Sequence, residues 1–400
     1  MKLFSFFKFY LPLLLLCVGN LAAQTWREKA AFPGALRDDA IGFHLNGFGY
    51  VGTGVSSGGI FNDDFYRYDP QFNSWQKVEH IKGLARQYCS SFATNTKGYI
   101  IGGILPDWSY TNEVQCYTPE TNSWELVAPL PINPRYSALS FSIGNTGYVG
   151  GGRNLNESFN DFWAFNALQN EWEQKEDLPN GSRYEAIGFS IGGFGFFGLG
   201  KQVNGNSFND FWKYTPTTDR WTRLADFPGK ISTYAISFSH GIFGYICTGI
   251  DELGVTINEF WRYNSQTDQW LLLPNPAFGN LRGTSTFTLD NCTYITTGKD
   301  ETNTRVEHTW AFCSDKESEL TAIIYPNPAS NVLTIDLIHL YREGQLFIYN
   351  VQGRLMHQLD VTENQNSYPI NLHGFNAGIY CIKIVDKDLK PLLSTKFIKR

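Results

Sequence analysis

Short apolar runs that end in glycine recur along the chain, and each is followed by an aromatic run. Apolar runs of this length, bounded by turn residues, are typical of β-strands. The glycine-ended runs are GYVGTG (49–54), GYIIGG (98–103), GYVGGG (147–152), GFFGLG (195–200), GYICTG (244–249) and TYITTG (293–298). The aromatic runs are FYRY (65–68), VQCY (114–117), FWAF (162–165), FWKY (211–214), FWRY (260–263) and TWAF (309–312). With 16% aromatic residues and 38 glycines, the chain is predicted to be all-β.

These runs belong to a repeat. Tryptophans at 26, 75, 124, 172, 221 and 270 are separated by 49, 49, 48, 49 and 49 residues, and SFNDFW stands at both 158–163 and 207–212. Eleven residues before each of the last five tryptophans is an acid: Asp64, Glu113, Asp161, Asp210 and Glu259. Arginines stand 37 or 38 residues before four of them: Arg37, Arg86, Arg135 and Arg183. Ser232 takes this place in the fifth unit, and we expect Arg282 to resume the series in the sixth.

Each unit divides into four predicted strands, a to d in chain order. Strand a follows the arginine, b is the glycine-ended run, c is the aromatic run and d begins at the tryptophan. With a period near 50, residues 24–317 resemble the kelch-repeat family, and the resemblance implies a β-propeller. Six a, b and c strands are present but only five d strands follow them, so the segment at Trp26 is predicted to supply the sixth and close a six-bladed ring. A blade cannot bury both faces alone, which is why neighbouring units must stack.

A second domain is predicted over residues 318–400, because the repeat stops at Phe312 and a charged connector begins at Ser314. Short alternating strands and Asn/Gly turns indicate a small β-sandwich. The phrases YPNPA (325–329), YNVQGR (349–354) and GFNAGIY (374–380), with the lysine-rich end KFIKR (396–400), resemble the C-terminal sorting domain of the type IX secretion system. That resemblance implies a protein of a Bacteroidota-like bacterium, delivered by the type IX machinery and either released or held at the cell surface.

Residues 1–23 are predicted to be a signal peptide. Two lysines precede an apolar stretch at 11–18, and LAA (21–23) offers small residues for cleavage before Gln24. The apolar stretch is too short for a membrane span, and the residue before Cys17 is not the small one that lipidation usually needs. The net charge of −6 gives no basic footprint for nucleic acid. We therefore expect a secreted or cell-surface protein without a transmembrane anchor.

The repeat places the arginines, the glycines of strand b and the acids at one end of every blade. In propellers this end is the usual ligand-bearing mouth, by analogy of fold. Because strand a is innermost, Arg37, Arg86, Arg135, Arg183 and Arg282 are candidate ligand-binding residues around a funnel, where a guanidinium can hold a carboxylate through two hydrogen bonds. The structural alternative is that each arginine pairs with its own blade's acid. His308 replaces that acid in the sixth unit, so we expect Arg282 to be the most available.

Other candidate residues lie near the same end. Trp108 and Tyr110, in the second b–c loop, fall outside the repeat register and could either stack on a sugar ring or cap their own loop. His308 completes the candidate set. Cys292 opens strand b and Cys313 closes strand c of the sixth unit, so they lie opposite one another in an antiparallel pair, and we expect a disulfide.

Two functions from different classes remain open. The first is a non-catalytic, monomeric binding module that recognises a glycan, including an acidic one, or a protein at the mouth. The second is an enzyme resembling the exported kelch mutarotases that epimerise sialic acids, in which arginines hold the carboxylate and an acid/base pair moves the proton. No clear buried acid–histidine pair is present, which favours the first. No cofactor is expected, since only His80 and His308 lie near the mouth, too few for the copper site of a galactose oxidase.

Overall fold

The computed structural model describes residues 26–230, 233–313, 321–338, 343–362, 365, 367–386 and 391–400. The predicted signal peptide, Cys17 and Ser232 lie outside the described residues. The described regular structure consists of β-strands and one 3₁₀ turn, η1 (Ser57–Gly59), so the all-β prediction is confirmed. Among these residues no helix has the length and apolar character needed to cross a membrane.

Up to Cys313, the described residues form six four-stranded antiparallel sheets, which we name blades 1 to 6 in chain order. Blade 1 consists of β3 (Ile41–Leu45), β4 (Phe48–Gly52), β7 (Phe65–Asp69) and β8 (Ser74–Val78). Blade 2 consists of β9 (Ser90–Ala93), β10 (Gly98–Ile101), β11 (Val114–Thr118) and β12 (Ser123–Val127). Blade 3 consists of β13 (Leu139–Ile143), β14 (Thr146–Gly150), β15 (Phe162–Asn166) and β16 (Glu171–Lys175). Blades 4 and 5 are β17 (Ile187–Ile191), β18 (Phe194–Gly198), β19 (Phe211–Thr215) and β20 (Arg220–Arg223); and β21 (Ile236–His240), β22 (Phe243–Cys247), β23 (Phe260–Asn264) and β24 (Gln269–Leu273). Blade 6 is β26 (Ser285–Leu289), β27 (Cys292–Thr296), β29 (Thr309–Cys313) and β1 (Trp26–Lys29).

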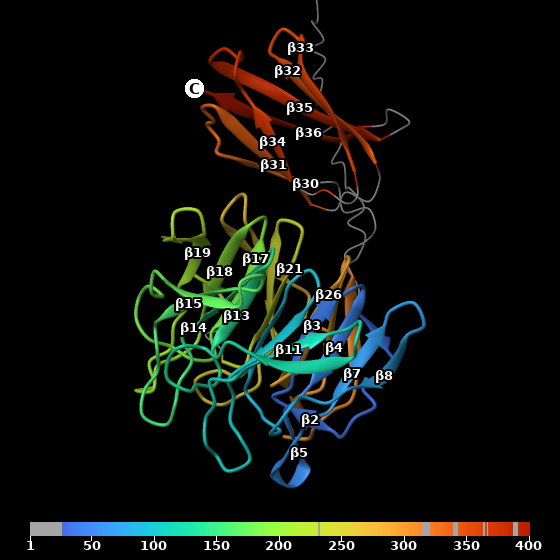
Figure 1. Ribbon diagram of the computed structural model, residues 1–400, viewed down its shortest axis with the longest axis vertical. Helices are drawn as coiled ribbons and strands as arrows, with labels where there is room; N and C mark the ends of the chain where they lie inside the picture. Colours follow the sequence, from blue (N-terminus) through green and yellow to red (C-terminus); the bar gives the residue numbers. More distant parts are fainter. Residues whose placement is uncertain are drawn as a thin grey trace, which may run out of the picture.

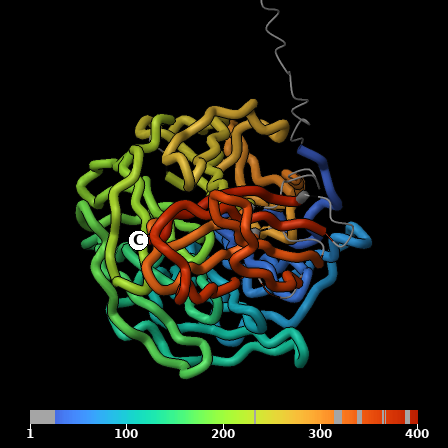
Figure 2. Tube along the Cα trace, turned by 90° about the horizontal axis from the view of Figure 1, so that it is seen from above, coloured from blue at the N-terminus to red at the C-terminus, as the bar shows by residue number. Residues whose placement is uncertain are grey.

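Blade 6 takes its outermost strand from the N-terminal end of the described chain. β1 is antiparallel to β29, with Trp26 opposite Phe312 and Glu28 opposite Trp310. This is the pairing that the count of d strands predicts. Seen from above, the colours run round the ring from blue through green to orange, and β26 of blade 6 lies beside β3 of blade 1 (Figure 2). The last blade is therefore in contact with the first.

Neighbouring blades pack through a phenylalanine that lies on a glycine. A Cβ added to Gly49 would lie 2.1 Å from the ring of Phe287, and one added to Gly147 would lie 2.0 Å from the ring of Phe92. The same contact joins Gly98 to Phe43, Gly195 to Phe141 and Gly244 to Phe189. Glycine therefore recurs at the start of strand b because only a residue without a side chain lets the next blade approach so closely.

A second contact ties the outer edges of the blades. In blade 1, Asn73 has a φ of 47° and accepts the N–H of Ala30, while Trp75 Nε1 donates to the carbonyl of Ala30. The N–H and the C=O of Ala30, which follows the outermost strand of blade 6, are thus both hydrogen-bonded to side chains of blade 1. The tryptophans at 124, 172, 221 and 270 repeat the arrangement with the carbonyls of Glu79, Ala128, Glu176 and Ala225. The repeated tryptophan is therefore an inter-blade hydrogen-bond donor.

Within the described residues this tie has no counterpart at blade 6, where strands c and d come from opposite ends of the repeat and share no turn. Pro274 stands 49 residues after Ala225 and has no N–H to donate. A covalent link is found in the same blade instead: Cys292 and Cys313 face each other across β27 and β29 and form the disulfide that the sequence predicted. The blade without a c–d turn is thus the blade that carries the cross-link.

The C-terminal residues form two further sheets. One contains β30 (Thr321–Tyr325), β31 (Val332–Ile338) and β34 (Ser367–Asn371), and the other contains β33 (Leu355–Val361), β32 (Gly344–Asn350), β35 (Gly378–Asp386) and β36 (Pro391–Lys399). Ile323 packs against the turn at Gly192, and the Tyr325 ring lies 5.7 Å from the Phe194 ring of blade 4. In Figure 1 these sheets lie at one end of the propeller, while the short strands β2 (Arg37–Asp38) and β5 (Val55–Ser56) lie at the opposite end. The predicted mouth therefore faces away from the C-terminal domain.

Candidate functional site

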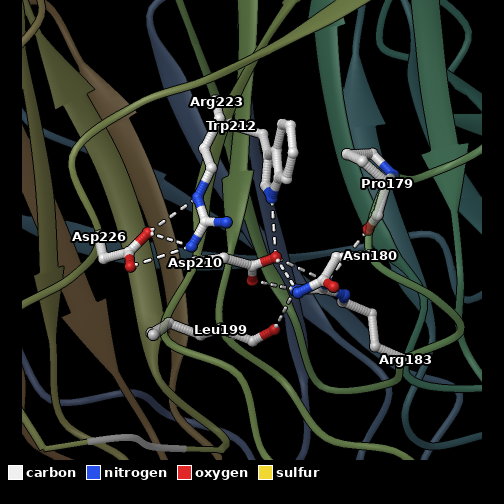
Figure 3. Close-up of polar contacts among 8 residues, drawn as sticks. All are labelled: Pro179, Asn180, Arg183, Leu199, Asp210, Trp212, Arg223 and Asp226. Carbon is white, nitrogen blue, oxygen red and sulfur yellow. Dashed lines mark hydrogen bonds and ion pairs between the residues drawn. The ribbon is translucent and has the colours of Figure 1, made fainter.

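The four repeated arginines are buried, and each forms an ion pair with the acid of its own blade. The pairs are Arg37–Asp64, Arg86–Glu113, Arg135–Asp161 and Arg183–Asp210. In blade 4 the Arg183 guanidinium donates to both Asp210 oxygens at 2.6 and 3.0 Å and to the Leu199 and Pro179 carbonyls (Figure 3). Burial alone would raise the pKa of Asp210, but the hydrogen bonds and charge of Arg183 outweigh it and hold that pKa below its ordinary value.

This bonding corrects the prediction that Arg37, Arg86, Arg135 and Arg183 face the funnel and bind a ligand. Their exposed fractions lie between 0% and 2%, so a ligand in the funnel would not reach them. The alternative, that each arginine pairs with the acid of its own blade, is the one observed: each guanidinium links the residues before strand a to the residues before strand c. Arg37, Arg135 and Arg183 also donate to the carbonyl of the residue that directly follows strand b.

Arg282 is not the sixth member of this series. In blade 1, Arg37 lies opposite Ser56 and Asp38 opposite Val55, whereas Arg282 lies opposite Lys299 in the pair β25 (Leu281–Arg282) and β28 (Lys299–Asp300). The Leu281 carbonyl accepts the Gly249 N–H, as the carbonyl of the corresponding arginine does in other blades. Leu281 therefore occupies the arginine position and Arg282 the next one, so its side chain leaves the strand on the opposite face. It is half-buried and donates to Asn303 Oδ1, and we find no carboxylate in direct contact with it in the described part of the chain.

The remaining predicted site residues lie at the mouth but in different settings. Trp108 has a φ of 66°, is 67% exposed and has its ring centre 5.7 Å from that of Phe61. Tyr110 is half-buried, and its ring stacks at 5.3 Å on Tyr136 of the next blade. His308 lies 3.1 Å from Glu28 Oε1 of β1, with both side chains 58% exposed, and therefore contacts the outermost strand of its own blade rather than Arg282.

Three rings of residues line the mouth, and of their members sequence reasoning had named only Arg282 and Tyr110. In each blade, the residue that follows the arginine position pairs with the first residue of the hairpin that connects strands b and c, and that residue pairs in turn with one across the hairpin. The first ring is Asp38, Gln87, Tyr136, Tyr184, Thr233 and Arg282, and the second is Val55, Ile104, Arg153, Lys201, Ile250 and Lys299. The third is Phe61, Tyr110, Ser158, Ser207, Thr256 and Arg305. In contrast to the recurring glycines of strand b, these positions differ from blade to blade, which was the signal available in the sequence.

The residue after the first ring forms a fourth set, which we name the axial ring. Its members are Asp39, Tyr88, Ser137, Glu185, Tyr234 and Gly283, one from each blade. The five that are not glycine have φ between 52° and 57°. Left-handed backbone costs such residues about 1–2 kcal/mol each, and strain of this kind clusters at functional sites. Its recurrence in every blade makes the axial ring a feature of the repeat.

Side chains of the axial ring meet across the propeller axis. The hydroxyls of Tyr88 and Tyr234, from blades 2 and 5, lie 3.5 Å apart. Asp39 lies close enough to Tyr88, and Glu185 to Tyr234, for the tyrosine to affect the pKa of the acid. Opposite blades thus carry similar residues: acids on 1 and 4, tyrosines on 2 and 5, and the small Ser137 and Gly283 on 3 and 6. The ring has an approximate twofold symmetry that the sequence repeat does not reveal.

The two carboxyl groups of the axial ring have unusual titration behaviour. Burial, followed by the charge of neighbouring Asp38, raises the pKa of Asp39 to about 8, although Tyr88, Lys299 and Arg282 oppose the shift. Burial also raises the pKa of Glu185, against the attraction of Lys201, whose Nζ lies 3.3 Å from Glu185 Oε2. The mouth therefore holds two carboxyl groups that keep their protons more strongly than exposed ones do.

Arg153 is a half-buried guanidinium at the mouth that has no carboxylate partner among the described residues. It lies over the rings of Tyr136 at 5.7 Å and Tyr184 at 4.6 Å, and donates only to carbonyls of its own hairpin. The lysines of the same ring are neutralised: Lys201 by Glu185, and Lys299 by Asp38. No cluster of three or more histidine, cysteine or acidic side chains that could hold a metal occurs in the described ranges.

Four-stranded sheets that follow one another around an axis, with variable residues gathered at one end, define a β-propeller. Residues 44–243, half of the chain, match the family model described as the KLHDC2/KLHL20/DRC7 Kelch-repeats domain. The chain therefore belongs to the kelch-repeat family. Residues 323–400 match the secretion system C-terminal sorting domain, so the protein is an exported propeller, secreted or displayed at the cell surface.

Two individual proteins are similar to parts of the chain. A stretch of 63 residues is 38% identical to an N-acetylneuraminate epimerase of Yersinia enterocolitica, but it spans only 14% of this chain and 16% of that protein. The solved structure titled "Structure of YjhT" shares the fold with a TM-score of 0.61 and 15% identity, over 70% of this chain and 96% of that chain. At that identity the structural likeness shows the fold alone.

Proposed function

We propose that this exported propeller binds an acidic glycan at its mouth, with Arg153 as the carboxylate-binding group. The observation that carries the proposal is the Arg153 guanidinium, which has no carboxylate partner in the described part of the chain and lies over the rings of Tyr136 and Tyr184. A guanidinium can take a carboxylate through two parallel hydrogen bonds. Tyrosine faces offer the apolar, polarised surface on which a sugar ring stacks, and Tyr110 and Trp108 extend that surface toward the rim.

The build of the mouth supports a preorganised site. The b–c hairpins are closed by Asp or Asn side chains that accept a backbone N–H two residues further on: Asp107, Asn154, Asn204, Asp251 and Asp300. Loops that are ordered before binding lose less entropy when a ligand arrives. We take residues 24–317 as the binding unit and residues 318–400 as the unit that directs export. The sorting domain lies at the opposite end (Figure 1), so a ligand would have access to the mouth with that domain in place.

The test is calorimetric titration of the full mature chain with N-acetylneuraminate, trigalacturonate and a neutral galactose oligosaccharide. The acidic saccharides should bind and the neutral one should not. Arg153→Ala should weaken binding by about 1.5–3 kcal/mol, the range for a hydrogen bond to a charged group. Arg220→Ala is the matched control, because Arg220 is 70% exposed on the outer strand β20. The proposal fails if no acidic saccharide binds, or if both variants bind equally.

The axial ring favours a second candidate, a sugar epimerase or mutarotase. Asp39, with a pKa of about 8, and Glu185, whose pKa burial also raises, are two carboxyl groups that could act as a general acid and base. The short match to an N-acetylneuraminate epimerase points to the same substrate class. NMR of freshly dissolved N-acetylneuraminate would detect catalysed interconversion of its anomers, and Glu185→Gln should slow it. Interconversion no faster than in buffer would exclude this candidate for that sugar.

A further inference from the structure

Two consecutive acids, Asp38 and Asp39, stand at the mouth, and Lys299 and Arg305 form ion pairs with Asp38 only among the described residues. Asp38 is 2% exposed and takes both nearby cations, Lys299 at 2.7 Å and Arg305 at 2.6 Å. Asp39 is 9% exposed and forms no ion pair with a described residue, and the neighbouring group that most opposes its raised pKa is the hydroxyl of Tyr88. A buried carboxylate without an ion partner is costly, and a like charge on the adjacent residue increases that cost. The arrangement therefore favours a neutral Asp39.

On the side of blade 6, the Asp39 carboxyl packs against the backbone of Gly283, whose carbonyl also accepts the Asp39 N–H at 2.9 Å. Gly283 stands at the axial position there, and a Cβ on it would lie 2.7 Å from Asp39 Oδ1. Any other residue at 283 would press on this carboxyl. Across the axis, blade 3 carries the small Ser137. The charged and titratable groups that face Asp39 are therefore Asp38, Tyr88, Lys299 and Arg282, with Tyr234 and Glu185 beyond Tyr88.

We propose that Asp39 makes ligand binding at the mouth proton-linked: its neutral form admits a carboxylate-bearing glycan, and loss of its proton expels it. This inference rests on the proposed function. An ionised Asp39 would place a second negative charge beside Asp38, and this charge would repel an incoming carboxylate. A neutral carboxyl removes that repulsion and can donate a hydrogen bond to a ligand oxygen. The pKa of about 8 places the change where both forms are populated in mildly alkaline solution.

The experiment measures the affinity of the full mature chain for trigalacturonate by calorimetry, from two pH units below to two units above the Asp39 pKa of about 8. Affinity should fall about tenfold or more through that range, since tenfold corresponds to a pKa raised by one unit on binding. Asp39→Asn should bind tightly across the range with a flat profile. Asparagine is neutral, close in shape and tolerant of the positive φ at this position. Glu173→Gln, which removes a carboxylate that is 73% exposed on the outer strand β16, should keep the fall and its midpoint.

A second readout does not need the glycan. The wild-type protein at neutral pH should show the infrared C=O stretch of a protonated carboxylic acid, and Asp39→Asn should lose the part of this band that comes from Asp39. Absence of that band, a flat affinity profile in the wild type, or a fall that persists in Asp39→Asn would each overturn the inference while leaving the proposed function intact. Failure of trigalacturonate and N-acetylneuraminate to bind at any pH would instead overturn the proposed function, and the inference with it.

Discussion

Replacing Arg183 by alanine should destabilise the propeller strongly, because it removes one partner of a buried ion pair. The Asp210 side chain is 3% exposed and would keep only the donors Trp212 Nε1 at 2.7 Å and Asn180 Nδ2 at 2.9 Å. The carbonyls of Leu199 and Pro179 would also lose a donor. Breaking a buried pair in this way costs about 3–5 kcal/mol. We expect a loss of free energy of unfolding in that range.

Arg86→Ala is the matched comparison within the same chain. Its partner Glu113 is 46% exposed and accepts one hydrogen bond from Arg86, at 2.8 Å. Water can replace the lost donor there, so the cost should be about 1–2 kcal/mol, that of a charged hydrogen bond at a partly solvated site. The difference between the two variants should therefore be about 2 kcal/mol, although the arginines hold equivalent places in the repeat.

The assay is urea unfolding of the full mature chain, followed by tryptophan fluorescence. The pKa of Asp210 is lowered in the folded protein, so the stability from this pair is present above the unfolded pKa of 3.8 and is lost as the pH falls through the folded value. The gap between wild type and Arg183→Ala should accordingly shrink in acid. Equal losses for the two variants, or losses below about 1 kcal/mol for both, would refute the burial argument.

Three further predictions concern closure and titration. Deleting residues 24–32 removes β1 and exposes an edge of blade 6, so the melting temperature should fall; a truncated chain that melts like the wild type would exclude this role. Reducing the Cys292–Cys313 disulfide, which spans 21 residues, should cost about 3 kcal/mol in the chain-entropy model, as measured by unfolding with and without reductant, and Cys313→Ser should be insensitive to reductant. The free energy of unfolding should decline as the pH rises from 3.8 to about 8, because folded Asp39 keeps a proton that the unfolded chain releases. In Asp39→Asn the free energy of unfolding should lose this dependence on pH, and an unchanged dependence would assign the proton to another group.

The sequence alone determined the strands, the repeat and the two families. These follow from local features that recur at a fixed step: the glycine at the start of strand b, the tryptophan that opens strand d and the turn residues between them. Each feature has one physical task in every copy, such as close approach at Gly49 or the hydrogen bond from Trp75, so repetition exposes it. The disulfide could be predicted for the same reason, since antiparallel register places Cys292 opposite Cys313.

Only the tertiary structure decided which side chains face the funnel. Arg282 differs from the arginine series by one position, and in a strand one position reverses the face, so spacing of 37 or 38 residues could not distinguish it from Arg37. The burial of Arg183 depends on its partners Asp210, Leu199 and Pro179, which the fold brings together from different parts of blade 4. The axial contact joins Tyr88 and Tyr234, which are 146 residues apart, and it exists only because the blades return to a common axis. The sequence repeat therefore predicts the contacts that recur in every copy. Contacts at the axis, such as the one between Tyr88 and Tyr234, depend on positions where the copies differ.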